Sequence, residues 1–197
     1  MVSPDDLALR SNSGAMDPVK VPIFDLDGTL VDSDEALLAP FLALGIERDA
    51  IPPPGMLLEE ACSLCGVTVA DYLAAYDPSL VRPFSGVAKL IEGLVRWNVC
   101  SNKRRAVGRL ELELLGWEPE RALFAEDFGG RPKHLDSLLN DLGLDATDVV
   151  FVGDTDHDRA CADAAGVPFF LAGWNPRAEA KAGDIRLSCP ADLLERL

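Results

Sequence analysis

The sequence predicts an α/β fold: a Rossmann-like, doubly wound parallel sheet with a small all-helical insert after the first strand. Short apolar runs alternate along the chain with segments of helical periodicity, which is typical of parallel sheets covered by helices on both faces. Polar residues also follow the ends of three of these runs, where sheets of this kind carry their functional sites. The 197 residues are enough for one full core and a small appendage.

The predicted strands are short and apolar. The first covers residues 19–24 and ends at Asp25, and a later one, over residues 149–152, is bounded by Asp148 and Gly153 and reads as fully buried. The remaining strand-like runs are residues 99–100, 122–125, 167–171 and 185–187, of which the last is a candidate edge strand before a final helix.

Three helices are predicted between these strands. Residues 104–115 have apolar side chains at helical spacing and stop at Gly116. Residues 132–142 present one leucine-rich face, opened by Pro132 and closed by a glycine. Residues 158–165 form a helix of small residues that ends at Gly166.

Residues 34–82 interrupt the alternation, because no strand signal separates their helices at 34–44, 56–65 and 69–76, with a turn at 52–55. We interpret this segment as a helical cap domain that covers the site, with hinges near Ser33 and at Arg82-Pro83. The core domain then comprises residues 19–33 and 83–197. Residues 1–18 are polar and weakly periodic, and we expect a flexible lead-in.

The composition limits the classes of partner that we expect for this protein. The formal net charge is −15, which disfavours nucleic acid and anionic membrane surfaces as partners. The basic run Lys103-Arg104-Arg105 is too small for a nucleic-acid footprint, and we interpret it as an exposed helix face. No apolar run reaches the roughly 20 residues needed to span a bilayer, and the N-terminus lacks a signal-peptide pattern. We therefore expect a cytoplasmic protein; the sequence does not indicate its oligomeric state.

Five scattered cysteines do not form a disulfide framework. Cys62 and Cys65 have C-x-x-C spacing, but a zinc site needs two more ligands and the two histidines are far away in sequence. We interpret the pair as small residues of a helix.

Four polar segments are candidates for chemistry: residues 25–29 (DLDGT), Ser101-Asn102, Lys133 and residues 153–158 (GDTDHD). Each alone also has a structural interpretation. A D-x-D pair is often an acidic turn, Asp154 or Ser101 could cap a following helix, and Lys133 could be a solvated helix residue. Their order and their positions at strand ends favour a shared site.

Together the segments resemble the four motifs of the haloacid dehalogenase-like hydrolase superfamily, over nearly the whole chain from about residue 19. "VPIFDLDGTLVDS" resembles the first motif, "VCSNKR" the second and "VVFVGDTDHDRACADAAGVP" the fourth. The insert resembles the small helical cap of phosphoglycolate-phosphatase-like members. The third motif departs from the family's Lys-Pro order: the chain has Arg131-Pro132-Lys133, and we choose Lys133, with Arg131 as the rival.

The resemblance implies a role for each residue. Asp25 is the expected nucleophile, and Asp27 the general acid and base. Ser101 is expected to bind a phosphoryl oxygen, and Lys133 to offset charge. Gly28, Thr29 and Asn102 are expected beside the substrate, and the expected Mg²⁺ ligands are the side chains of Asp25 and Asp154, the main-chain carbonyl of Asp27 and, through a bound water, Asp158.

The predicted function is a Mg²⁺-dependent phosphatase, a phosphoric monoester hydrolase that cleaves a small phosphorylated metabolite through an aspartyl-phosphate. A phosphomutase of the same superfamily is the main alternative, and a catalytically silent phosphate-binding or regulatory protein is another. A dehalogenase would not need Asp27, and a phosphonatase needs a cap lysine, which is absent between Lys20 and Lys89. A receiver domain is disfavoured by the cap, and neither a P-loop nor a dinucleotide-binding motif is present.

The cap sequence also limits the substrate. Residues 34–82 contain eight acidic residues against two arginines, which suits a single phosphate better than a bisphosphate. Candidate specificity residues in this segment are Met56, Leu57, Tyr72 and Tyr76, although helical apolar residues more often belong to a core.

Overall fold

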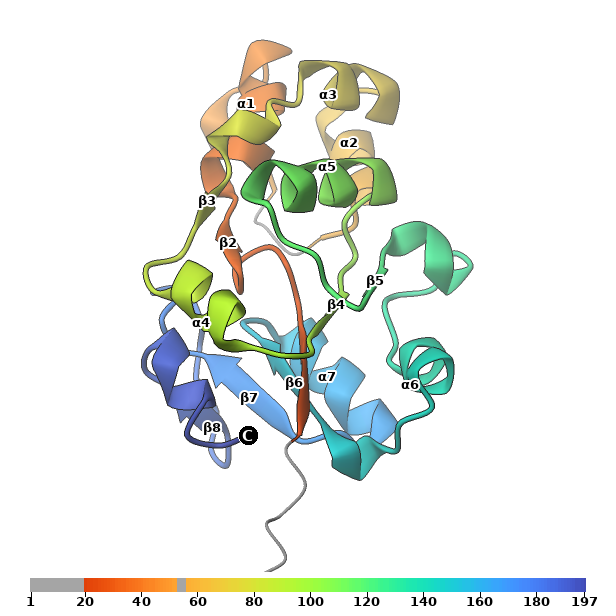
Figure 1. Cartoon of the computed structure of the whole chain (residues 1–197). Helices are drawn as coiled ribbons and strands as arrows, with labels where there is room; N and C mark the ends of the chain where they lie inside the picture. The colour runs from red at the N-terminus through yellow and green to blue at the C-terminus, as the bar shows by residue number, and fades with distance from the viewer. Residues whose placement is uncertain (1–19, 53–55) are drawn as a thin grey trace, which may run out of the picture.

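A six-stranded parallel sheet forms the centre of the molecule in the computed structural model, which describes residues 20–52 and 56–197 (Figure 1). The strand order is β5-β4-β1-β6-β7-β8, so β8 is an edge strand as predicted. The strands are β1 (Val21–Phe24), β4 (Asn98–Cys100), β5 (Arg121–Leu123), β6 (Val149–Gly153), β7 (Phe169–Ala172) and β8 (Ile185–Leu187). The predicted α/β fold is confirmed.

Alternate side chains of each strand enter different cores, because successive residues point to opposite faces of a sheet. In β6, Val150 and Val152 pack in one core with residues of α4 (Val87–Gly93) and α5 (Arg105–Leu115). Val149 and Phe151 pack on the other face with residues of α6 (Asp136–Leu142) and α7 (Asp156–Ala165). This arrangement is the doubly wound architecture that the continuous apolar strands predicted.

The insert folds into helices α1 (Asp34–Ala43), α2 (Leu58–Cys65) and α3 (Val69–Ala75), which lie above the carboxyl ends of the strands with α5 (Figure 1). They share a small core of Phe41, Ala61, Cys62 and Tyr72, separate from the two cores of the sheet. Cys62 and Cys65 are free thiols within α2, in agreement with their interpretation as helix residues.

A two-stranded antiparallel ladder joins the two ends of the insert, and the sequence did not predict it. In β2 (Val31–Asp32) and β3 (Arg82–Pro83), Val31 pairs with Pro83 and Asp32 with Arg82. Strands of two residues are too short for periodicity to reveal. One predicted hinge position, Ser33, directly follows β2, and the other, Arg82-Pro83, is β3 itself; hinge motion there stays a prediction.

Three helix predictions need correction. The helix predicted from Pro132 starts only at Asp136; in the segment before it, the Lys133 main-chain N–H donates to Asn102 Oδ1 (2.9 Å), which fixes this segment against the loop after β4. The helix predicted from residue 158 starts two residues earlier, at Asp156, where the side chains of Thr155 and Asp158 form a capping box. The final predicted helix is a 3₁₀ turn over Pro190–Leu193.

Other 3₁₀ turns connect the remaining elements: η1 (Arg48–Ala50), η2 (Pro78–Leu80), η3 (Ala125–Phe128) and η4 (Ala146–Asp148). The predicted lead-in, residues 1–18, and most of the predicted turn at 52–55 lie outside the described residues. Within residues 20–52 and 56–197, no helix is both long and apolar enough to cross a membrane.

Candidate active site

The candidate site lies at the carboxyl ends of three neighbouring strands. Asp25 follows β1, Ser101 follows β4 and Asp154 follows β6. The chain runs from β1 outward to β4 and β5 and then returns to β6 on the other side of β1, and this reversal opens a crevice at the strand ends. The fold therefore brings together residues that are separated by up to 129 positions in the sequence.

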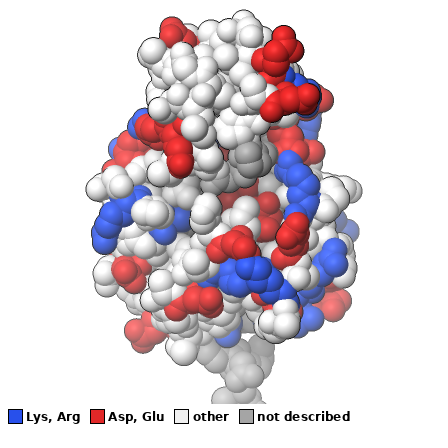
Figure 2. All heavy atoms as spheres, turned by 180° about the vertical axis from the view of Figure 1, so that it is seen from behind, with Lys and Arg blue, Asp and Glu red and all other residues white. Residues whose placement is uncertain are grey.

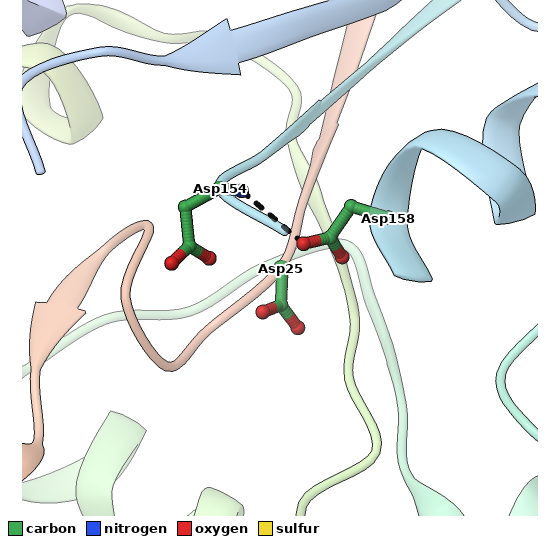
Figure 3. A group of neighbouring side chains, drawn as sticks. All are labelled: Asp25, Asp154 and Asp158. Carbon is green, nitrogen blue, oxygen red and sulfur yellow. Dashed lines mark hydrogen bonds between the residues drawn. The ribbon is translucent and has the colours of Figure 1, made fainter. Parts of the chain in front are cut away.

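Three carboxylates converge in this crevice. Oxygen atoms of Asp25, Asp154 and Asp158 lie within 4.8 Å of one another, and the three side chains lie next to one another at the strand ends (Figure 3). Burial, reinforced by the neighbouring carboxylates, raises the pKa of Asp25 to about 7 and that of Asp154 to about 8. A cluster of oxygen donors whose negative charges are this poorly solvated fits a hard divalent cation such as Mg²⁺.

Lys133 provides the positive charge of the cluster. Its Nζ lies 2.7 Å from Asp25 Oδ1 and 2.5 Å from Asp158 Oδ1, and its side chain is buried. Burial opposes the charge of Lys133, but Asp158 and Asp25 hold its pKa well above the usual value. The rival Arg131 is exposed and approaches the ring of His134 instead. The geometry therefore favours Lys133 over Arg131 as the third-motif residue.

Asp158 anchors the loop that carries Asp154. Its Oδ2 accepts hydrogen bonds from the main-chain N–H groups of Asp154 (3.2 Å, dashed in Figure 3) and Thr155 (2.9 Å), and from the Thr155 hydroxyl (2.5 Å). Burial opposes its ionisation, but Lys133 and these hydrogen bonds hold its pKa below the usual value. Asp158 therefore positions both Lys133 and the Asp154 loop, and its predicted contact with a metal-bound water stays a prediction.

The residues of the first two motifs occupy distinct places. Gly28 and Asn102 line the cavity, whereas Thr29 is completely buried and donates a hydrogen bond to Asp154 Oδ1 (3.2 Å). Gly28 has φ +78°, and a Cβ atom there would lie 2.3 Å from Asp154 Oδ2, so glycine is required at this position. Ser101 does not cap α5, because its Oγ accepts from the main-chain N–H of Lys103 (3.3 Å).

The interpretation of the basic run as an exposed helix face is wrong for Lys103. It lies before α5, it is 9% exposed, and its Nζ lies 2.7 Å from both Asp27 Oδ1 and a carboxylate oxygen of Glu111. Glu111 also accepts a hydrogen bond from the hydroxyl of Tyr76, at the end of α3. Two signals could have revealed this network: Lys103 directly follows Ser101-Asn102, and Glu111 is an acid one position before the buried Leu112 of α5.

The loop after β7 contributes two residues that sequence reasoning missed. The Asn175 amide donates to Gly28 O and to Asp154 Oδ2, both at 2.9 Å, and its side chain is buried. The indole N–H of Trp174 donates to Thr29 O (2.8 Å). This loop therefore clamps the first-motif turn against Asp154. Nothing in its local pattern distinguishes Asn175 from an ordinary turn residue.

A cavity of about 390 Å³ lies between the insert and the strand ends, with Asp25, Asp27, Ser101, Lys133 and Asp154 among its lining residues. On the face shown in Figure 2 the surface is hollowed between the upper and lower parts of the molecule, and acidic and basic side chains surround the hollow. Of the candidate specificity residues, Met56, Tyr72 and Tyr76 line the cavity. Leu57 does not, and its side chain is exposed instead.

Comparison with known proteins identifies relatives of this chain. The family model "Haloacid dehalogenase-like hydrolase" matches residues 65–172. A phosphoglycolate phosphatase of Xylella fastidiosa is 31% identical over 201 residues, which cover 87% of each chain. The pyrophosphatase PpaX of Halalkalibacterium halodurans is 23% identical over 189 residues, 82% of this chain and 86% of that protein. A crystal structure of a putative phosphoglycolate phosphatase from Lactobacillus plantarum superposes with a TM-score of 0.72 at 23% identity, covering 92% of this chain and 100% of that one.

The fold and these matches define a class of protein: a hydrolase built on a Rossmann-like parallel sheet, in which the acidic cluster lies at the carboxyl ends of the strands. The chain belongs to the haloacid dehalogenase-like hydrolase family. The resemblance noted from the four motifs is thereby confirmed, as is the prediction of a hydrolytic enzyme.

Proposed function

We propose that the protein is a phosphoric monoester hydrolase that cleaves a small phosphomonoester through an aspartyl-phosphate on Asp25, with Mg²⁺ as its cofactor. The observation that carries this proposal is the position of Asp25. Its carboxylate lines the floor of the cavity, contacts the Lys133 ammonium at 2.7 Å and belongs to the acidic cluster. Two named relatives, a phosphoglycolate phosphatase and a pyrophosphatase, also act on phosphate compounds by name.

In the first proposed step, a carboxylate oxygen of Asp25 attacks the phosphorus atom. The bond between phosphorus and the leaving oxygen breaks, and Asp27 donates its proton to that oxygen, so that the alcohol departs. Lys133 offsets negative charge on Asp25 and on the phosphoryl group, while Ser101 binds a phosphoryl oxygen. Lys103 positions the Asp27 side chain at the cavity lining, two residues after the nucleophile.

In the second proposed step, water attacks the phosphorus atom of the aspartyl-phosphate. Asp27 accepts a proton from the water, and the bond between phosphorus and the Asp25 oxygen breaks, which releases inorganic phosphate and restores the Asp25 carboxylate and the protonated Asp27. Mg²⁺ would be held by the side chains of Asp25 and Asp154 with the main-chain carbonyl of Asp27, and when bound it neutralises charge between these carboxylates and the phosphoryl group.

The test is release of inorganic phosphate from p-nitrophenyl phosphate and a panel of phosphomonoesters, with Mg²⁺ and with EDTA. We expect release only with Mg²⁺, and a loss of about a thousandfold or more in Asp25→Asn. Asp141→Asn, an exposed acid on α6, is the matched control. When the substrate carries a radiolabelled phosphoryl group, protein quenched with acid during turnover should carry the label as an aspartyl-phosphate. Hydroxylamine, which cleaves acyl-phosphates, should remove this label. Full activity of Asp25→Asn would exclude this mechanism.

The same panel separates the alternatives. A phosphomutase would return an isomeric phosphate ester rather than inorganic phosphate, and a silent binding protein would turn over nothing. The acidic insert argues for a single phosphate on the substrate, because its two arginines face an excess of carboxylates. Faster turnover of bisphosphates than of monoesters would contradict this part of the proposal.

A further inference from the structure

The insert gives the cavity an apolar upper wall. Helix α1 contributes Leu37, Leu38 and Phe41, and α3 contributes Tyr72 and Leu73. The rings of Phe41 and Tyr72 pack together, with centroids 4.8 Å apart. The charged residues that contact the phosphoryl group in our proposal lie on the opposite side, at the ends of the strands. The cavity therefore has a polar floor and an apolar wall.

The tyrosine hydroxyls of this wall already have partners. Tyr72 donates to the main-chain oxygen of Leu37 (2.9 Å), and Tyr76 donates to Glu111. Tyr76, which is half-buried, consequently offers ring surface to a ligand rather than a hydroxyl group, whereas Tyr72 is almost completely buried and supports the wall from behind. Aromatic ring surface of this kind binds apolar groups well and anions poorly.

The cations around the cavity are already paired within the described part of the chain. Lys133 contacts two carboxylates on the floor, as described above. The other pairs are Lys103 with Asp27 and Glu111, Arg104 with Glu59 and Glu126, and Arg177 with Asp34. An anionic group above the phosphoryl site would have to compete with one of these carboxylates, and it would also meet the negative charge of Glu179, which lines the same cavity.

From this arrangement we infer that the upper cavity is a leaving-group subsite for an uncharged apolar alcohol, aryl or alkyl, and that it disfavours esters whose alcohol part carries a carboxylate. The inference rests on the proposed phosphatase. The volume of about 390 Å³ lies in the range of small-molecule pockets. A carboxylate buried against the wall would lose its hydration without gaining a cation, whereas a phenyl or alkyl group would gain contact with the rings.

The sharpest test compares benzyl phosphate with para-carboxybenzyl phosphate, because the leaving alcohols are closely matched in acidity and differ in one charge. We expect kcat/KM to be about tenfold or more higher for benzyl phosphate. Ethyl phosphate and phosphoglycolate form a smaller pair of the same kind, with the same expected order. If the carboxylate-bearing ester of each pair were turned over as fast as its uncharged counterpart or faster, the inference would be overturned.

Val107 offers a matched pair of variants. It lies on α5, it is partly exposed and it lines the cavity. Val107→Arg places an additional cation beside the subsite, so the preference for benzyl over para-carboxybenzyl phosphate should fall by about tenfold. Val107→Leu adds bulk without charge and should keep the preference. An unchanged ratio in Val107→Arg would contradict a subsite selected by charge.

Binding measurements separate this inference from the proposed mechanism. Asp25→Asn can be titrated with both benzyl esters in the presence of Mg²⁺ by calorimetry. Tighter binding of benzyl phosphate supports the subsite even if the wild-type protein releases no phosphate, in which case only the proposed function fails. Tighter binding of para-carboxybenzyl phosphate overturns the subsite even if the wild-type protein is an active phosphatase.

Discussion

Asp27 Oδ1 lies 2.7 Å from Lys103 Nζ, and this contact connects the first motif with a residue 76 positions later. Lys103 also contacts the buried Glu111, so its removal leaves a buried carboxylate without its cation. We expect Lys103→Met to lower the free energy of unfolding by on the order of 3 kcal/mol. It should also lower kcat, because the carboxylate of Asp27 loses its anchor. Thermal unfolding and steady-state kinetics measure the two effects.

A double variant separates stability from catalysis. Lys103→Met combined with Glu111→Met removes the buried charge of Glu111 along with its partner, and such apolar replacement restores stability in other buried ion pairs. We expect the unfolding temperature to recover while kcat stays low, because Asp27 is still unsupported. Recovery of both properties would show that Lys103 acts on stability alone.

Asn175 should control the affinity for the metal. Its amide holds Asp154 Oδ2 at 2.9 Å and Gly28 O at the same distance, so it orients a predicted metal ligand. Loss of such an outer contact typically costs about tenfold or more in metal affinity. We expect this loss in Asn175→Ala, measured by Mn²⁺ titration with electron paramagnetic resonance. The exposed Asn140 on α6 provides the control Asn140→Ala, and equal affinities in the two variants would refute the role.

The stability of the metal-free protein should depend on pH through the acidic cluster. The pKa values of Asp25 and Asp154 rise from 3.8 to about 7 and about 8 on folding. Between pH 4 and pH 8 the folded protein therefore binds more protons than the unfolded chain, and its free energy of unfolding falls as the pH rises. Below pH 4 both states are protonated and this contribution is constant.

Denaturant unfolding in EDTA at pH 5 and pH 8 measures this fall. General repulsion from the net charge of −15 acts in the same direction, so the decisive comparison is with Asp154→Asn, which should show a smaller fall than the wild-type protein. Added Mg²⁺ should stabilise the wild-type protein more at pH 8 than at pH 5, since the carboxylates must be ionised to bind it. A steeper fall in Asp154→Asn would contradict the assignment.

Gly108 should not tolerate alanine although it lies inside α5. A Cβ atom there would lie 2.2 Å from Cε1 of Phe124, a completely buried ring. Alanine favours a helix over glycine by about 1 kcal/mol, but overpacking costs typically 1–3 kcal/mol and more when the neighbour cannot move. We expect net destabilisation in Gly108→Ala by chemical denaturation. Gly93→Ala in α4, where the nearest atom is 3.7 Å away, should be neutral or stabilising.

The fold could be predicted well from the sequence because its signals are local. Continuous apolar strands such as Val149–Gly153, helix stops at Gly116 and Gly166, and the acids after β1 and β6 are each readable within a few residues. The wrong predictions concern segments whose structure depends on contacts with residues that are distant in the sequence. Pro132 marks a plausible helix start, but the helix begins only at Asp136, and Lys133 in the segment between them contacts Asn102, 31 positions earlier.

The sequence by itself determined the α/β alternation and the set of residues, from Asp25 to Asp158, that could share one site. Only the tertiary structure decided that Lys133 rather than Arg131 contacts Asp25, that Lys103 is a buried partner of Asp27, and that Asn175 clamps Asp154. The physical reason is that periodicity and turn chemistry act between neighbours in the chain. Ion pairs and buried hydrogen bonds depend on which strand ends the fold places side by side.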